Sequence, residues 1–112
     1  MAALATNSVP LTGLQLDGLL VAATGGGDTC ATGAGVVLAV KNADAGSHTV
    51  TLATPQTVDG DLAVADRTIT VAAGKTELIP VTARYRDPST GRAAITYDGV
   101  TSVTVGVFRV GV

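Results

Sequence analysis

The sequence predicts an all-β domain built as an antiparallel β-sandwich of six to eight strands, and three observations lead to this prediction. Apolar and polar residues alternate with a period of two in repeated short runs, and no long helical pattern occurs. Alanine, valine and threonine supply 51 of the 112 residues, and Val and Thr favour the pleated strand over the helix. Turn-forming residues separate the runs at the spacing of a sandwich.

Six runs are predicted to be strands, and every second residue within a run is predicted to face the core. The runs span 36–41, 49–52, 68–71, 77–81, 93–97 and 103–110. The side chains assigned to the core are Val36, Leu38, Val40, Val50, Leu52, Ile69, Val71, Ile79, Val81, Ile95, Tyr97, Val103 and Val105. Pro80 cannot donate to a ladder, so its strand is predicted to be an edge strand or to be bulged there. An immunoglobulin-like or a jelly-roll-like sandwich is compatible with these runs.

The last predicted strand contains a conflict of phase. Alternate valines from Val103 to Val107 share one face, whereas Phe108 and Val110 belong to the other. A bulge near Gly106 would resolve the conflict, and so would the burial of both faces of the strand.

Residues 1–35 differ from the rest because they hold seven of the 14 glycines and show little regular alternation. We expect an extended N-terminal arm with one or two short strands, around 11–16 and 19–22, followed by a sandwich body over 36–112. Ordering such a segment costs roughly 1–2 kcal/mol of backbone entropy per residue, so it is expected to dock on the body or on a partner. The apolar anchors expected for docking are Leu11, Leu14, Leu16, Leu19 and Leu20.

The low charge of the chain excludes several kinds of partner. The formal net charge is −2 and charged residues are 14% of the chain, so the basic surface that binds nucleic acid or anionic lipid is missing. No stretch approaches the length of a membrane-spanning helix. The first residues also lack the basic and apolar segments of a secretory signal. We therefore expect a protein made in a cytosolic setting, without nucleic-acid or membrane partners.

Glycine-rich and aspartate-rich segments are the first candidates for ligand sites. The three glycines at 25–27 have no lysine nearby and do not fit a phosphate-binding loop. Asp59, Asp61 and Asp66 lie close in sequence, but Thr70 stands where a twelve-residue calcium loop needs its final acid. Solvated turns are the preferred interpretation of both segments, and no metal or cofactor is expected.

The sequence contains no combination of residues that indicates catalysis. His48 is the only histidine and Cys30 the only cysteine, so neither a His pair nor a Cys cluster is available for a metal. His48 is expected to be a partly exposed strand residue. Cys30 is expected to be a buried thiol or an inert loop residue, without a base to activate it. The chain also lacks a Gly-x-Ser-x-Gly elbow and any tryptophan, and we interpret it as a protein without enzymatic activity.

Arg84, Tyr85 and Arg86 form the only basic cluster in the sequence. Such a triplet is often a loop with cation–π or salt-bridge contacts. Tyr and Arg are also enriched at binding hot spots. We therefore treat all three as candidate interface residues, beside the leucines of the arm.

Segments from residue 26 to the end, about three-quarters of the chain, carry a resemblance to a known group of proteins. They span 26–29, 36–42, 49–55, 62–71 and 103–110. Together they resemble small structural proteins that tailed bacteriophages, particularly those of actinobacteria, encode near their head genes. The family has no catalytic residues to carry over. The N-terminal third departs from the pattern, which leaves the mode of attachment open.

The resemblance implies a structural virion protein that binds the outside of an HK97-like capsid as a decoration, or cement, protein. The implied partner is the major capsid protein, and a homo-oligomer, preferably a trimer, is expected. The implied location is the capsid surface, after synthesis in the bacterial cytoplasm. Two other classes stay open: a tail or head–tail connector subunit, and an immunoglobulin-like adhesion or carbohydrate-binding module.

Overall fold

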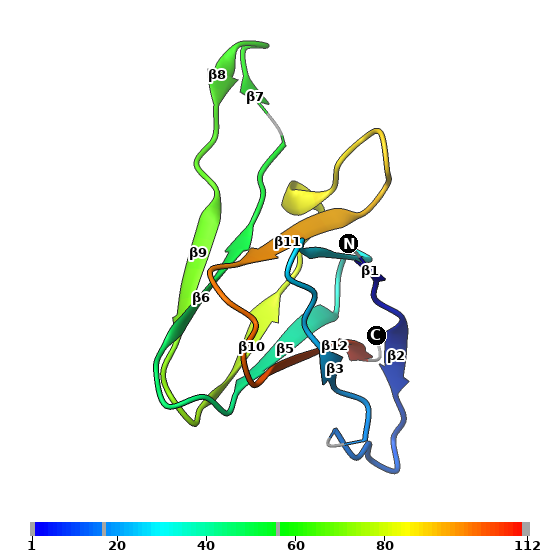
Figure 1. Ribbon diagram of the computed structural model, residues 1–112. Helices are drawn as coiled ribbons and strands as arrows, with labels where there is room; N and C mark the ends of the chain where they lie inside the picture. The colour runs from blue at the N-terminus through cyan, green and yellow to red at the C-terminus, as the bar shows by residue number, and fades with distance from the viewer. Residues whose placement is uncertain (1, 17, 56, 111–112) are drawn as a thin grey trace.

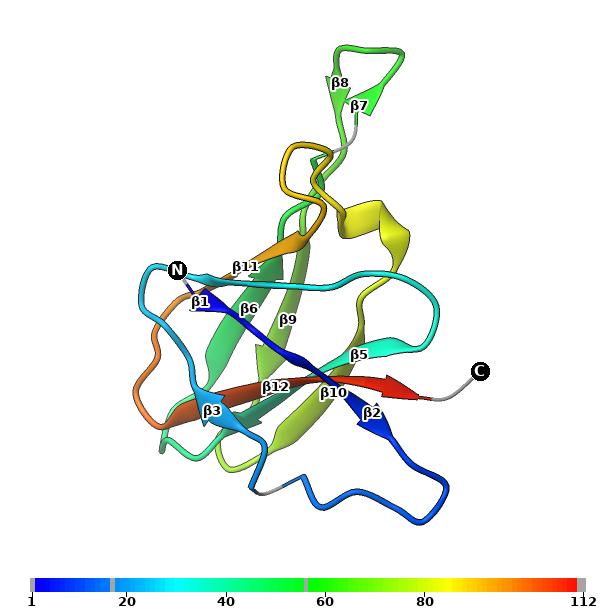
Figure 2. The same cartoon turned by 90° about the vertical axis from the view of Figure 1, so that its right-hand side faces the viewer.

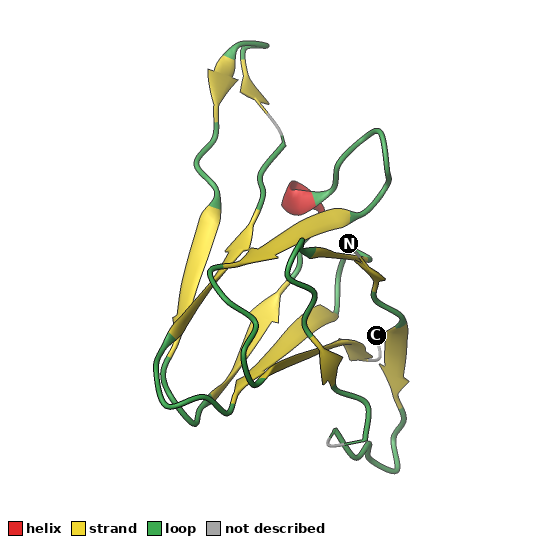
Figure 3. Ribbon diagram, in the orientation of Figure 1, coloured by secondary structure: helices red, strands yellow, loops and turns green. Residues whose placement is uncertain are grey.

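The computed structural model describes residues 2–16, 18–55 and 57–110. Strands make up 47% of the described residues, and two sheets pack together as a sandwich (Figures 1 and 3). One turn of 3-10 helix, η1 (Ala83–Tyr85), is the helical element of these ranges. No helix in them is long and apolar enough to cross a membrane. The predicted all-β sandwich is confirmed.

Each of the two sheets has five strands. The first sheet runs in the order β1 (Ala2–Ala3), β4 (Asp28–Cys30), β11 (Ala93–Tyr97), β6 (His48–Leu52) and β9 (Arg67–Val71). The second runs in the order β10 (Thr76–Pro80), β5 (Val36–Asn42), β12 (Val103–Val110) and β2 (Thr6–Val9), and β3 (Val21–Ala22) also pairs with β12. A separate hairpin is made of β7 (Thr57–Val58) and β8 (Leu62–Ala63).

The six predicted strands appear as β5, β6, β9, β10, β11 and β12, each within one residue at either end. The sandwich has more strands than the six to eight expected, because residues 2–30 add four short ones. Its sheets are mixed instead of wholly antiparallel, because β1 pairs parallel with β4 and β2 pairs parallel with β12. Both differences therefore come from the first third of the chain.

Residues 1–35, expected to form an extended arm outside a body over 36–112, are instead built into both sheets as far as they are described. β4 lies between β1 and β11 in the first sheet, while β2 and β3 lie beside β12 in the second (Figure 2). Residues 11–16 form a turn at 11–12 and irregular backbone beyond it in place of the expected strand, and of 19–22 only β3 is a strand. β1, β2 and β4 were missed because each has two to four residues, too few to show a period.

A buried carboxylate ties the N-terminal residues to the sandwich. Asp28 has no exposed surface. It accepts hydrogen bonds from the Tyr97 hydroxyl at 2.7 Å, the Thr24 N–H at 3.2 Å and the Ala2 N–H at 3.3 Å. Because an unpaired buried charge is strongly unfavourable, these three donors hold the segments that carry them in place.

Arg92 makes a second tie to the same segment. Its guanidinium donates to the Leu4 carbonyl at 2.8 Å, and to the Thr29 carbonyl and hydroxyl at 3.2 Å each. Leu4 itself is buried where the chain passes from β1 in the first sheet to β2 in the second. Residues 1–35 were expected to dock on the body or on a partner. In the structure, the described part of this segment packs on the sandwich of its own chain.

Alternation predicted the core well. Eleven of the 13 predicted core residues are buried, and the other two, Ile69 and Tyr97, are half-buried and pack against the core. The core residues outside the prediction are Leu4, Ala23, Cys30, Tyr85, Ala93 and Val107. Most of them come from the irregular first third or from a turn, where a period of two gives no guide.

The phase conflict in β12 is resolved by the burial of both faces. Its pairing with β5 is continuous from Val103 to Arg109, so the strand is not bulged. The alternate valines belong to the core, while Gly106 and Phe108 are buried on the opposite face. A Cβ at Gly106 would lie 3.0 Å from one carbon of Leu20 and two ring carbons of Phe108. The glycine therefore leaves room for these two side chains.

Candidate functional site

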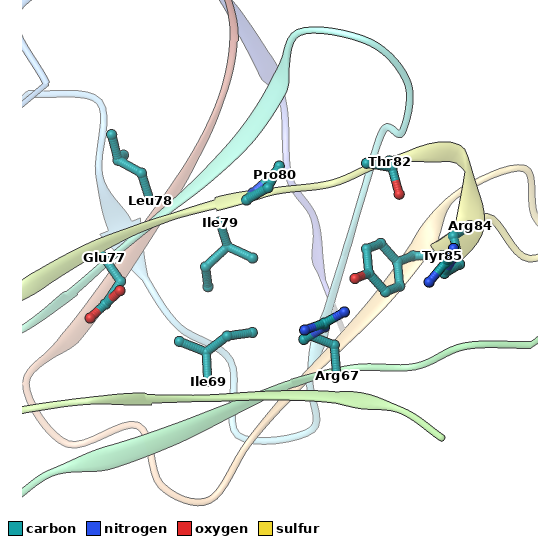
Figure 4. A pocket seen from close by; sticks show the side chains of 9 residues that line it. All are labelled: Arg67, Ile69, Glu77, Leu78, Ile79, Pro80, Thr82, Arg84 and Tyr85. Carbon is teal, nitrogen blue, oxygen red and sulfur yellow. The ribbon is translucent and has the colours of Figure 1, made fainter. Parts of the chain in front are cut away.

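The strongest candidate site is a groove between β9 and β10, at one side of the sandwich. Each of these strands is the last in its sheet, so no further strand in the described ranges closes the gap between them. The groove has a volume of about 470 Å³, a size that can accept a small ligand or several side chains. It is lined by Arg67, Ile69, Glu77, Leu78, Ile79, Pro80, Thr82, Arg84 and Tyr85 (Figure 4).

The middle of the groove is apolar. Ile69 on β9 and Ile79 on β10 point toward each other across it, because each has the inward phase of its strand (Figure 4). Tyr85, which η1 carries, is largely buried, and its ring stands beside them. The three side chains form an apolar surface that an incoming aliphatic side chain can contact.

Charged side chains stand at both ends of the groove. Arg67 and Arg84 lie near Tyr85, and Glu77 lies at the other end (Figure 4). Among the described residues, the ion pairs within 4 Å are both made by His48, so neither arginine is paired there. The arginine end is therefore suited to a carboxylate that enters beside an apolar group.

Pro80 limits what the edge of β10 can bind. The Val81 N–H donates to Val36, and Lys75 accepts from Asn42, each at 2.9 Å. Odd-numbered residues of this segment thus direct their backbone groups toward β5, and the nitrogen of Pro80 faces the free edge. The prediction of an edge strand is confirmed. Because proline has no N–H, a partner finds fewer donors along this edge, and side-chain contacts matter more.

A second cluster joins His48 to two carboxylates. Its Nε2 lies 2.9 Å from Asp44 Oδ2, and its Nδ1 lies 3.0 Å from Asp98 Oδ1. Hydrogen bonds with Asp44 and then Asp98 raise the pKa of His48. The bond with His48 lowers the pKa of Asp44, and hydrogen bonds with the Thr49 backbone and then with His48 lower the pKa of Asp98. A Cβ at Gly99 would lie 3.1 Å from the imidazole, so the glycine allows this close approach.

The cluster fastens the loop after β5 to the turn after β11. His48 is partly exposed, as predicted, but the sequence did not indicate that two carboxylates orient it, because Asp98 is 50 residues away. Within the described ranges, no group of three His, Cys, Asp or Glu side chains is arranged to hold a metal ion. We interpret the cluster as a structural clasp.

Cys30 is a buried thiol, in agreement with the first of its two predicted environments. It lies in β4 without exposed surface. Burial raises its thiol pKa to about 11, although the nearby charge of Arg92 lowers it slightly. The thiol is thus protonated near neutral pH and packs as a small apolar group.

The five predicted leucine anchors divide by their exposure. Leu11 and Leu16 are exposed, in the segment between β2 and β3. Leu14, Leu19 and Leu20 are half-buried. Figures 1 and 2 both place this segment at the end of the molecule opposite the β7–β8 hairpin.

The predicted basic cluster lies only partly in the groove. Arg84 and Tyr85 line it, whereas the Arg86 backbone pairs with Ala93 outside the lining. Arg67 was missed by the sequence analysis. Arg67 lies on the same face of β9 as Ile69 and Val71, which point toward the core. A charged residue on that face could have indicated that the core is open at this end.

The glycine and aspartate segments form turns, as predicted. The Gly27 N–H donates to the Thr24 carbonyl at 2.9 Å. Asp66 accepts the Thr54 N–H at 2.8 Å. Asp59 and Asp61 lie in the exposed turn of the β7–β8 hairpin.

Comparison of the chain with models of known families, with characterised proteins and with solved structures finds no match of any of the three kinds. Function is therefore inferred from the geometry of this chain and from the sequence resemblance.

Proposed function

We propose that the chain is a non-enzymatic structural protein of a tailed-phage virion, which binds the outside of the capsid and stabilises it as a decoration protein. One observation carries the attachment: exposed Leu11 and Leu16 lie in the segment between β2 and β3, at one end of the sandwich. The partner is the major capsid protein, and the location is the capsid surface.

The physical argument rests on what exposed leucines on a firmly held segment can do. Leu11 is fully exposed and Leu16 is 38% exposed, so both offer apolar surface to a partner without refolding. Strands β2 and β3, which flank the segment, both pair with β12. The segment is therefore held at both ends, which lowers the entropy that binding must offset. Leu19 and Leu20 are half-buried and pack beside β12, which further fixes the segment.

Low charge also fits this role. Interface cores are depleted in charged residues, and only 14% of the chain is charged. A coat protein present in many copies needs one surface for the capsid and another for its neighbours. A homo-oligomer, preferably a trimer, is part of the proposal.

Binding to capsids tests the proposal. The protein is mixed with undecorated capsids assembled from a major capsid protein encoded in the same genome, and bound protein is measured by co-sedimentation. The double variant Leu11→Ser with Leu16→Ser is expected to lose binding, while Val110→Thr, at another exposed apolar position, retains it. Unchanged binding by the double variant would refute the attachment by these leucines.

Immunogold labelling of phage particles tests the location. Label on the capsid surface supports the decoration role. Label on the tail or at the head–tail junction would assign the chain to the tail or connector class instead. Particles without label, together with binding to a glycan array, would favour the adhesion or carbohydrate-binding module.

A further inference from the structure

The β7–β8 hairpin projects from the sandwich beyond the ends of β6 and β9 (Figures 1 and 2). Thr57 pairs with Ala63 and Val58 pairs with Leu62, so residues 59–61 form the turn. Asp59 (φ 55°) and Gly60 (φ 83°) both have left-handed backbones, a conformation that Asp and Gly tolerate in tight hairpin turns. The tip of the hairpin therefore has a defined backbone conformation, and it carries the carboxylates of Asp59 and Asp61 and the side chain of Leu62.

The tip exposes groups that match the groove. Leu62 is 58% exposed, and Asp59 and Asp61 are exposed beside it. A two-stranded hairpin is at best marginally stable alone in water, and this one stands clear of both sheets in both views (Figures 1 and 2). Packing against another surface would stabilise it.

We propose that the β7–β8 hairpin of one copy of this chain inserts into the groove between β9 and β10 of a second copy. Leu62 then contacts Ile69 and Ile79, and the carboxylates of the turn face the arginine end of the groove. The charges are complementary, because the tip carries two acids and that end carries Arg67 and Arg84. Tyr85 between them supplies the aromatic surface typical of hot spots.

The hairpin of one chain cannot enter the groove of the same chain. Residues 64–66 connect the hairpin to the start of β9, and β9 itself forms one wall of the groove. The tip consequently points away from its own groove (Figure 1). The contact must be between copies, and it is heterologous, with the hairpin of one copy meeting the groove of the next. Repetition of such a contact closes a ring or extends a chain of subunits.

This inference rests on the homo-oligomer of the proposed function and specifies the contact that builds it. It can be tested without capsids. Sedimentation velocity over a concentration series measures self-association of the full chain. The groove variant Arg67→Glu with Arg84→Glu, and the hairpin variant Leu62→Ser, are each expected to raise the dissociation constant by roughly tenfold or more. Lys75→Glu and Leu11→Ser are matched controls with the same kinds of change outside this contact, and both are expected to associate like the original chain. Circular dichroism checks that all variants fold.

Mixing the two variants tests the heterologous geometry. The groove variant keeps an intact hairpin and the hairpin variant keeps an intact groove, so the mixture is expected to form 1:1 dimers and nothing larger. A chain that stays monomeric at high concentration would overturn the proposal, and so would association that only Leu11→Ser weakens. Loss of capsid binding by Leu11→Ser with Leu16→Ser, while self-association persists, would separate the two proposals experimentally.

Discussion

At the scale of single residues, polar side chains hold distant segments of this chain together. Asp28 takes its three hydrogen-bond donors from three different parts of the sequence. Arg92 and Asn42 act in the same way, and Asn42 donates to the carbonyls of Gly46 and Val71. In the described ranges every buried side-chain nitrogen and oxygen has a partner. Each of these bonds contributes modestly, but leaving one partner unpaired is costly.

Removing one donor from Asp28 tests this account. Burial, followed by the hydrogen bond to Asp28, raises the pKa of Tyr97 well above its ordinary value, so the hydroxyl donates at any physiological pH. Tyr97→Phe is expected to lower the free energy of unfolding by about 1–3 kcal/mol, because the carboxylate loses a partner in a buried site. Urea denaturation measures the change. Tyr85→Phe, whose hydroxyl faces the groove, is the matched control and should change stability by less than about 0.5 kcal/mol. Equal effects of the two substitutions would contradict the account.

The His48 clasp predicts a dependence of stability on pH. The folded pKa of His48 is raised above 6.5, so its contribution is fully present below the unfolded pKa and is lost as the pH rises through the folded pKa. Asp44 and Asp98 have lowered pKa values and stay ionised from pH 5 upward. The stability advantage of the original chain over His48→Gln should thus shrink as the pH rises above about 6.5. Denaturation at several pH values measures it, and an advantage that is constant or grows with pH would refute the clasp.

At the scale of elements, β12 organises the second sheet. It pairs with β5 along one edge, and with β2 and β3 along the other. Its inner valines belong to the core, and its outer face is covered at Gly106 by Leu20 and the Phe108 ring. A strand with both faces buried tolerates little change in volume.

Adding volume at Gly106 is the corresponding test. Gly106→Val is expected to lower the free energy of unfolding by about 1–3 kcal/mol, because its side chain would meet Leu20 and Phe108. Gly46→Ala places a Cβ in open space and should change stability by less than about 0.5 kcal/mol. Thermal denaturation compares the two. An unchanged melting temperature for Gly106→Val would show that the outer face is not packed.

At the scale of the whole molecule, the first third of the chain completes the sandwich. Without β4 the first sheet would lose the strand between β1 and β11, and Cys30 would leave the core. Without β2 and β3 one edge of β12 would be unpaired. The segment that carries Leu11 and Leu16 and the β7–β8 hairpin also lie at opposite ends of the molecule, whose longest extent is 42 Å. One rigid body can thus contact a shell at one end and a neighbour near the other.

Deleting residues 2–30 is expected to prevent folding. The deletion removes β1, β2, β3 and β4 together with the buried residues Leu4, Ala23 and Cys30. We expect poor dispersion in the amide proton spectrum and no cooperative thermal transition. A cooperative transition in the truncated chain would instead restore the interpretation of residues 1–35 as a separate arm. Substitution of the exposed Leu11 and Leu16 in the full chain is therefore the sound test of attachment.

Much of the sandwich could be predicted from the sequence because alternation is a local property. In each of the six long strands, neighbouring residues show which face is inward, and the side chains assigned to the core on this basis are buried except for the half-buried Ile69 and Tyr97. The position of Pro80 at an edge follows equally from its own chemistry. The fold class, the main strands and most of the core therefore follow from local patterns in the chain.

The way in which distant segments meet becomes visible only in the folded chain. Strands of two to four residues carry no readable period, and β1 to β4 exist because longer strands and buried groups such as Asp28 pair with them. The groove arises where the last strands of two sheets face each other, which brings Arg67 to Arg84 and Tyr85. The pairing of His48 with Asp98 likewise spans 50 residues. Such contacts depend on which segments the closed sandwich places side by side, and no local pattern in the chain encodes that arrangement.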